Sequence, residues 1–189
     1  LETLIYLKHQ AKVWFEITTL LIPGENDSEQ EIEALTQWVV EQLGPDVPMH
    51  FTAFHPDWKM REIPHTPPAT LTMARRIAMR NGVRYAYTGN VSDLEGGSTY
   101  CHQCGKKLIG RDWYELSEWN LTADGKCRFC GTSCAGVFEA KPGRWGARRR
   151  PVLPRRAVGR RQDDGDEARQ PAGRAHVRRR ADRRPERGV

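Results

Sequence analysis

Four of the five cysteines form two pairs of the same type. Cys101 and Cys104 make one Cys-x-x-Cys-Gly motif, Cys127 and Cys130 make a second, and 22 residues separate them. The spacing turns both thiolates of a pair toward one concavity, and the glycine permits the tight bend behind them. Two such turns joined by a hairpin place four thiolates at the corners of a tetrahedron. We therefore predict a structural four-cysteine metal site, normally a zinc site.

Other chemistry is possible for these cysteines. Iron fits the same four thiolates, whereas disulfides need an oxidising compartment, which nothing in the sequence indicates. A closed set of four ligands leaves no position for a substrate, which argues against zinc catalysis. Cys134 lies four residues after the second pair and is expected to be a spare buried thiol.

The residues between the pairs predict a β-hairpin. Strand-like stretches at 107–109 and 113–119 precede a turn at Asp124-Gly125. A module of about 30 residues buries little core, so a metal would supply much of its folding free energy. We assign residues 98–138 to this four-cysteine ribbon.

The preceding residues alternate between helical and strand patterns. Ser28 and Glu31 form a capping box, and Thr66 is expected to cap another helix before Pro67. Asn26 and Asp27 are interpreted as caps, with shaping of the loop as the alternative. The alternation predicts parallel strands joined by crossover helices, either an incomplete sheet or a complete small α/β domain. The expected elements are a helix over 1–10, a strand over 13–22, a helix over 28–44, a strand over 48–54, a helix over 66–82 and a strand over 83–88.

Several stretches together resemble the C-terminal half of the AmmeMemoRadiSam system radical SAM enzymes, relatives of pyruvate formate-lyase activating enzymes. The resemblance covers roughly residues 1–138. It is carried by LIPGEND ending at 27, HFTAFHPD at 50–57, VRYAYTGNV at 83–91 and the two CxxCG motifs. It implies the C-terminal part of a partial (β/α) radical SAM barrel over 1–92, followed by the zinc-ribbon-like hairpin module.

The resemblance also implies chemistry. Members bind a [4Fe-4S] cluster through a CxxxCxxC motif and reductively cleave S-adenosylmethionine to a 5′-deoxyadenosyl radical. This sequence has no CxxxCxxC, so the cluster ligands would lie in a missing N-terminal half, and we expect this chain alone to be inactive. Other proteins of the AmmeMemoRadiSam system are the expected partners.

The resemblance suggests three residues for the S-adenosylmethionine pocket. His55 follows a strand where relatives place a His beside the adenosyl group. Thr18 lies on the preceding strand, where relatives often carry polar contacts, and Asn90 follows the last strand. Ligands of such barrels collect at the carboxyl ends of the strands. A locally hydrogen-bonded loop histidine is an equal interpretation of His55. His50 and Thr52 share one strand face and either line a barrel interior or form a satisfied interior pair.

Charge divides the chain. Residues 1–140 hold 13 Lys+Arg and 18 Asp+Glu, whereas residues 141–189 hold 17 and 6. The last 43 residues use only ten residue types, all with G/C-rich codons, and too few are apolar for a core. Residues 139–189 are therefore interpreted as a frameshift product, a disordered basic tail or a nucleic-acid-binding arm.

Three classes of function stay open: a radical enzyme fragment, a zinc-ribbon nucleic-acid-binding module and an inactive remnant. The acidic balance of residues 1–140 makes a nucleic-acid partner the weaker expectation. The sequence has no apolar run of the roughly 20 residues that cross a bilayer. It also lacks an N-terminal leader pattern, and we expect a cytoplasmic protein without a membrane partner.

Overall fold

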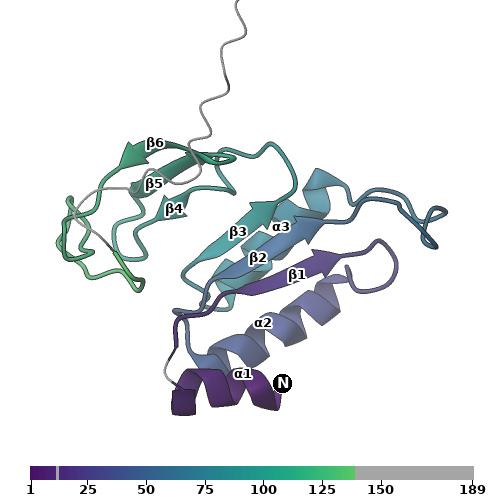
Figure 1. Cartoon of the computed structure of the whole chain (residues 1–189), viewed down its shortest axis with the longest axis horizontal. Coiled ribbons are helices and arrows are strands. Elements are labelled where there is room, and N and C mark those ends of the chain that lie inside the picture. Colours follow the sequence, from purple (N-terminus) through teal and green to yellow (C-terminus); the bar gives the residue numbers. More distant parts are fainter. Residues whose placement is uncertain (12, 139–189) are drawn as a thin grey trace, which may run out of the picture. The chain divides into compact units, whose positions relative to one another are not determined.

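The computed structural model describes residues 1–11 and 13–138, so the interpretations of residues 139–189 lie outside it (Figure 1). The described part is mixed α/β, with one parallel and one antiparallel sheet of three strands each. None of its helices is both long enough and apolar enough to cross a membrane.

The first sheet is parallel and follows chain order. Its strands are β1 (Ile17–Leu21), β2 (Met49–Ala53) and β3 (Ala86–Gly89), in the order β1-β2-β3. Helix α2 (Glu29–Leu43) connects β1 to β2, and α3 (Pro68–Arg80) connects β2 to β3. A short helix α1 (Glu2–Tyr6) and a π-helical turn η1 (Leu7–Ala11) precede them. The predicted alternation is confirmed, with shorter first and third strands.

Helices α2 and α3 cover one face of this sheet (Figure 1). Side chains alternate along a strand, so every second residue of β2 points into the core. Met49 and Phe51 are fully buried there against Ile32 and Val39 of α2 and Leu71 of α3. The opposite face carries Thr18, Leu20, His50, Thr52 and Tyr87. It is polar and partly open, with Leu20 42% exposed.

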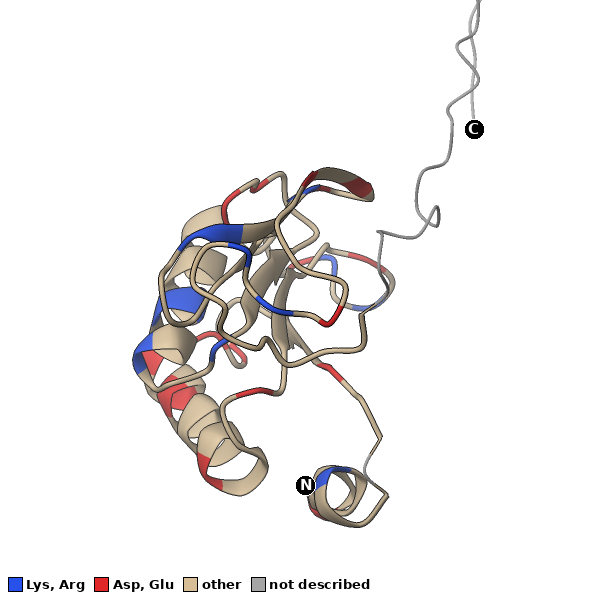
Figure 2. Cartoon of the chain, turned by 90° about the vertical axis from the view of Figure 1, so that its left-hand side faces the viewer, with Lys and Arg blue, Asp and Glu red and all other residues tan. Residues whose placement is uncertain are grey.

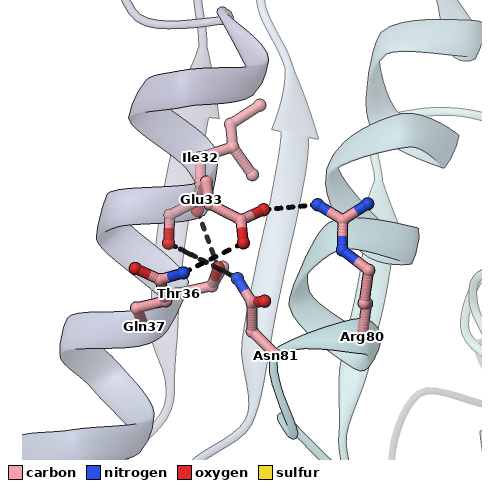
Figure 3. A network of polar contacts seen from close by, with 6 residues as sticks. All are labelled: Ile32, Glu33, Thr36, Gln37, Arg80 and Asn81. Carbon is pink, nitrogen blue, oxygen red and sulfur yellow. Dashed lines mark hydrogen bonds and ion pairs between the residues drawn. The ribbon is translucent and has the colours of Figure 1, made fainter.

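Charges are interleaved on the two long helices. Helix α2 carries acidic residues in its first turns and α3 carries arginines, and the two kinds lie beside each other in Figure 2. One network joins them (Figure 3): Arg80 donates to the Glu33 carboxylate, and the Asn81 amide donates to Thr36 Oγ1 at 2.8 Å. Thr36 is fully buried and in turn donates to the Ile32 carbonyl at 2.7 Å.

The cap of α2 is confirmed. Ser28 Oγ accepts from the Glu31 amide at 3.3 Å and donates to its carboxylate at 2.7 Å. Of the two interpretations of Asn26 and Asp27, helix capping is wrong and shaping of the loop is confirmed. Asn26 Oδ1 accepts from the Ile22 amide at 2.7 Å, and Asp27 accepts from the Gly24 amide. Both side chains fold the loop back on itself instead.

Thr66 does not cap α3, contrary to prediction. The N-cap position is Pro67, and no side chain caps it. Thr66 is buried between strands: its hydroxyl donates to the Leu21 carbonyl at 2.5 Å and accepts from the Phe54 amide at 2.8 Å. It therefore joins the ends of β1 and β2 to the loop before α3.

The second sheet is antiparallel and contains the predicted hairpin. Its strands are β4 (Thr99–Tyr100), β5 (Lys107–Asp112) and β6 (Glu115–Trp119). Trp113 lies in the tight turn between β5 and β6 with a φ of 52°, rather than in a strand. A small core holds this module together, made of Cys101, Leu108, Ile109, Leu121 and Cys127.

Candidate metal centre and the adjoining cleft

The first cysteine pair sits in a tight turn fixed by two backbone hydrogen bonds. The Gly105 amide donates to the Cys101 carbonyl at 2.9 Å, and the Cys101 amide donates to the Lys106 carbonyl at 2.9 Å. Gly105 has a φ of 70°, which glycine adopts without the Cβ penalty of other residues. This turn brings Cys101 and Cys104 to the same side of the loop.

The second pair repeats this geometry. The Gly131 amide donates to the Cys127 carbonyl at 2.8 Å, the Cys127 amide donates to the Thr132 carbonyl at 2.9 Å, and Gly131 has a φ of 77°. The shared motif therefore folds both loops in the same way, and the chain supplies two equivalent halves of one site.

The four sulfurs converge. All four Sγ atoms lie within 4.8 Å of one another, with 3.6 Å between Cys101 and Cys130 and 3.8 Å between Cys104 and Cys127. A tetrahedral zinc site with Zn–S bonds of about 2.3 Å has sulfurs about 3.8 Å apart. The predicted group of four is thus confirmed as a site that could hold a metal ion such as zinc.

The loops adjust the protonation of these sulfurs. Hydrogen bonds from the Thr132 hydroxyl and amide lower the pKa of Cys130 to about 6. The Lys106 amide lowers the pKa of Cys104, but burial and the neighbouring sulfurs outweigh it and raise that pKa to about 12. Four thiolates this close repel one another, so full deprotonation goes with metal binding and releases protons.

Cys134 lies outside the group of four. Burial raises the pKa of its thiol to about 11, which keeps the thiol protonated and unreactive at neutral pH. The next residue, Ala135, donates its amide hydrogen to the Tyr85 hydroxyl at 3.0 Å. This end of the module is therefore tied to the residue that precedes β3.

The structure does not gather the three residues expected to bind S-adenosylmethionine. Thr18 lies near the start of β1, in register with His50, and its side chain is exposed. His55 follows the end of β2, is exposed, and packs edge-to-face on His65 with ring centroids 4.3 Å apart. Asn90 follows β3 with a φ of 60°, and its amide donates to the Ala53 carbonyl at 3.3 Å. Only His55 and Asn90 share the carboxyl edge of the sheet.

An open cleft of about 490 Å³ lies beside the four-cysteine ribbon. One wall is the open face of the parallel sheet, and the other is the β5–β6 hairpin. Residues that line it include Glu16, His50, Tyr87, Asn90, Arg111 and Trp113. The sequence pointed to Asn90 as a pocket residue and to His50 on a strand face that could line a barrel interior. It did not point to Glu16, Tyr87 or Arg111. These residues carry no motif and meet only in the folded chain.

A chain of polar contacts crosses the floor of this cleft. His50 Nε2 lies 2.6 Å from the Glu16 carboxylate, and the His50 ring stacks on Tyr87 with centroids 4.9 Å apart. Arg111 lies over the Tyr87 ring at 5.7 Å and donates to Thr99 Oγ1 at 2.6 Å. The hydrogen bond with His50 lowers the pKa of Glu16, whereas burial raises the pKa of Tyr87.

Comparison with known proteins gives one relative without an assigned activity. A stretch of 120 residues is 41% identical to an uncharacterized protein of Methanocaldococcus jannaschii, MJ0808, and covers 63% of this chain. The chain spans only 36% of that relative's length. No protein-family model matches the sequence, and no solved structure matches it.

Proposed function

We propose that the chain is the C-terminal part of a radical S-adenosylmethionine enzyme, in which a structural zinc ribbon follows the last strands of a (β/α) barrel. The observation that carries the proposal is the position of the family-like stretches. LIPGEND runs from β1 into the loop after it, FHPD follows β2, and GNV runs from the last residue of β3 into the next loop. In a parallel sheet these three segments meet at the carboxyl edge, where barrel enzymes bind their ligands.

The two faces of the sheet also support this proposal. Helices cover one face, as on the outside of a barrel, and the other presents Thr18, His50, Thr52 and Tyr87. Parallel sheets are normally covered on both faces, so the partly open face fits a sheet that further barrel strands complete. A relative that extends over a much longer chain is consistent with such strands.

The reaction needs a [4Fe-4S] cluster and S-adenosylmethionine, and this chain offers candidate residues for the second cofactor but not for the first. The five cysteines do not fit a cluster of the CxxxCxxC type, since four converge on the ribbon site and Cys134 is partly buried outside the group. The described cysteines therefore supply no ligand set for such a cluster. His55 and Asn90 lie at the edge where S-adenosylmethionine would be held, and each offers a polar side chain there. Thr18 lies near the amino end of β1, away from this edge, so we do not propose it as a contact of S-adenosylmethionine.

The decisive experiment examines the coding sequence upstream of Leu1. We expect coding sequence upstream of Leu1 to supply a CxxxCxxC motif, and the long protein, reconstituted with iron and sulfide and reduced, to form 5′-deoxyadenosine from S-adenosylmethionine. The 189-residue chain alone should form none. His55→Ala in the long protein should slow the reaction, and Lys59→Ala in the same loop is the matched control. An upstream frame without the motif, or a loaded long protein that leaves S-adenosylmethionine intact, contradicts the proposal.

The zinc part is tested separately. We expect about one zinc per chain by elemental analysis, and loss of that zinc in Cys101→Ser and Cys127→Ser. Cys134→Ser should keep it, because this thiol lies outside the tetrahedron. A red protein with one iron per chain would show that the site binds iron instead of zinc. A metal-free protein would refute the proposed metal site.

Neighbouring carboxylates neutralise two of the three lysines of the described ribbon. Within the described ribbon Lys107 pairs with Glu118 at 3.3 Å, and Lys126 pairs with Asp124 at 2.6 Å. Lysines neutralised by neighbouring carboxylates contribute little to phosphate binding. Tight, salt-sensitive DNA binding by residues 1–140 would nevertheless favour a nucleic-acid-binding ribbon over the enzyme.

A further inference from the structure

The cleft between the parallel sheet and the β5–β6 hairpin has a polar floor and an apolar rim. Arg111 and His50 lie on the floor, and Trp113, Tyr114 and Leu94 line the rim with exposed fractions of 60%, 76% and 57%. Its volume of about 490 Å³ falls within the range of small-molecule sites. Large exposed aromatic side chains around a concave site provide contact area for a ligand.

Two carboxylates of the cleft already have partners. Glu16 Oε2 pairs with His50 at 2.6 Å, and Glu16 Oε1 accepts from the Trp14 indole at 3.2 Å. Asp93 accepts from the Thr88 hydroxyl at 2.9 Å and from the Gly96 amide at 2.8 Å. These groups stabilise the walls and offer little to a cationic ligand. Asp112, the third carboxylate, is exposed at the rim.

The donors of the cleft are less occupied. The Arg111 hydrogen bonds to Thr99 and Gly97 use Nη1 alone, and among the described residues no carboxylate forms an ion pair with this guanidinium. Its Nε and Nη2 groups have no hydrogen-bond partner within the same set. A partly buried, unpaired guanidinium fits the two oxygens of a carboxylate or phosphate.

We propose that this cleft binds a small molecule that carries a carboxylate or phosphate group on an aromatic or apolar body. Arg111 holds the oxyanion, and Trp113 and Tyr114 pack on the body of the ligand. The inference rests on the contacts of the cleft alone and does not depend on radical chemistry.

Nuclear magnetic resonance titration of the full chain, loaded with zinc, tests this site with four probes of similar shape. Benzoate and phenyl phosphate carry the two oxyanions, benzamide is neutral and benzamidine is cationic. We expect at least one oxyanion to shift the Arg111 Nε–H and Trp113 indole signals saturably, while benzamide and benzamidine leave them unchanged. The tighter oxyanion identifies the head group. Absence of saturable shifts with both oxyanions, or stronger binding of benzamidine, overturns the proposal.

Variants then assign the binding to named residues. Arg111→Gln should weaken oxyanion binding about tenfold or more, since a charged hydrogen bond is lost. Arg76→Gln, an exposed arginine on α3, is the matched control and should change nothing. Zinc content reports whether Arg111→Gln still folds. If it does not, Trp113→Ala at the exposed rim decides, and we expect about threefold weaker binding. Unchanged affinity in a folded Arg111→Gln, or in Trp113→Ala, overturns the assignment.

Discussion

At the scale of single residues, the Glu16–His50 pair connects two neighbouring strands of the parallel sheet through side chains. The pKa of Glu16 is lowered from its ordinary value of 4.5, first by the His50 hydrogen bond and then by Trp14 and the charges of His50 and Arg111. A carboxyl with a lowered folded-state pKa stabilises the protein above pH 4.5. That contribution is lost as the pH falls through the folded-state value.

We predict that Glu16→Gln flattens the pH dependence of the free energy of unfolding below pH 4.5. Because the Glu16 side chain is 46% exposed, solvent screens the pair, and the loss at neutral pH should stay below about 1 kcal/mol. Denaturant titrations from pH 3 to pH 7 measure the effect, with Glu115→Gln on the exposed hairpin as control. Parallel curves for the wild type and Glu16→Gln would contradict the pairing.

Thr66 gives a second prediction at this scale. Thr66→Val keeps the shape of the side chain but removes the hydroxyl shared by the Leu21 carbonyl and the Phe54 amide. Two buried backbone groups then lose their partner, so we expect a destabilisation of about 1–3 kcal/mol. Urea unfolding measures it. Thr72→Val on an exposed part of α3 is the control, and equal losses in both variants would contradict a special role for Thr66.

At the scale of elements, the turn before the second cysteine pair depends on a close approach of backbone and ring. Gly125 has a φ of 75°, and a Cβ there would lie 2.3 Å from the Phe138 ring. Gly125→Ala should therefore destabilise the ribbon by about 1–3 kcal/mol and weaken its metal affinity. Competition with a chromogenic zinc chelator measures the change. Ala123→Gly in the same turn is the control, and an unchanged affinity in Gly125→Ala would contradict the packing.

Elements with a local signal could be predicted from the sequence. The alternation of Met49, Phe51 and Ala53 identifies the buried face of β2, and the cap of α2 depends on Ser28 and Glu31 only three residues apart. The two cysteine turns could also be predicted, because each is encoded by five consecutive residues, Cys-x-x-Cys-Gly. The expected strand over 13–22 was too long, since β1 is limited by its pairing with β2 rather than by propensity.

Long-range contacts explain what could not be predicted. Threonine is a common residue type at helix caps, and Thr66 lies just before a helix. Its hydroxyl instead bonds the Phe54 amide and the Leu21 carbonyl, which are 12 and 45 residues away in the sequence. Glu16 and His50 are 34 residues apart, and Arg111 comes from a different module. No pattern of spacing marks such a group, so the polar floor of the cleft emerges only when both sheets are folded.

At the scale of the whole molecule, the two sheets draw their stability from different sources. The parallel sheet has a core formed with two long helices, whereas the ribbon core contains two of the four cysteines of the candidate metal site. We predict that metal removal by a chelator disorders β4, β5 and β6 while α2 and α3 persist. Amide signals of the ribbon should collapse, and the far-ultraviolet helical signal should remain. Simultaneous loss of both signals, or an intact apo ribbon, would contradict this division.

The shared cleft has a thermodynamic consequence. One of its walls belongs to the parallel sheet and the other to the β5–β6 hairpin. If metal removal disorders the hairpin, as predicted above, a ligand that touches both walls recognises only the metal-loaded fold. Metal and ligand are then heterotropic effectors of each other. If bound zinc raises the affinity for the ligand by some factor, bound ligand raises the affinity for zinc by the same factor. Occupancy of the cleft would therefore follow zinc supply, although no atom of the ligand needs to touch the metal.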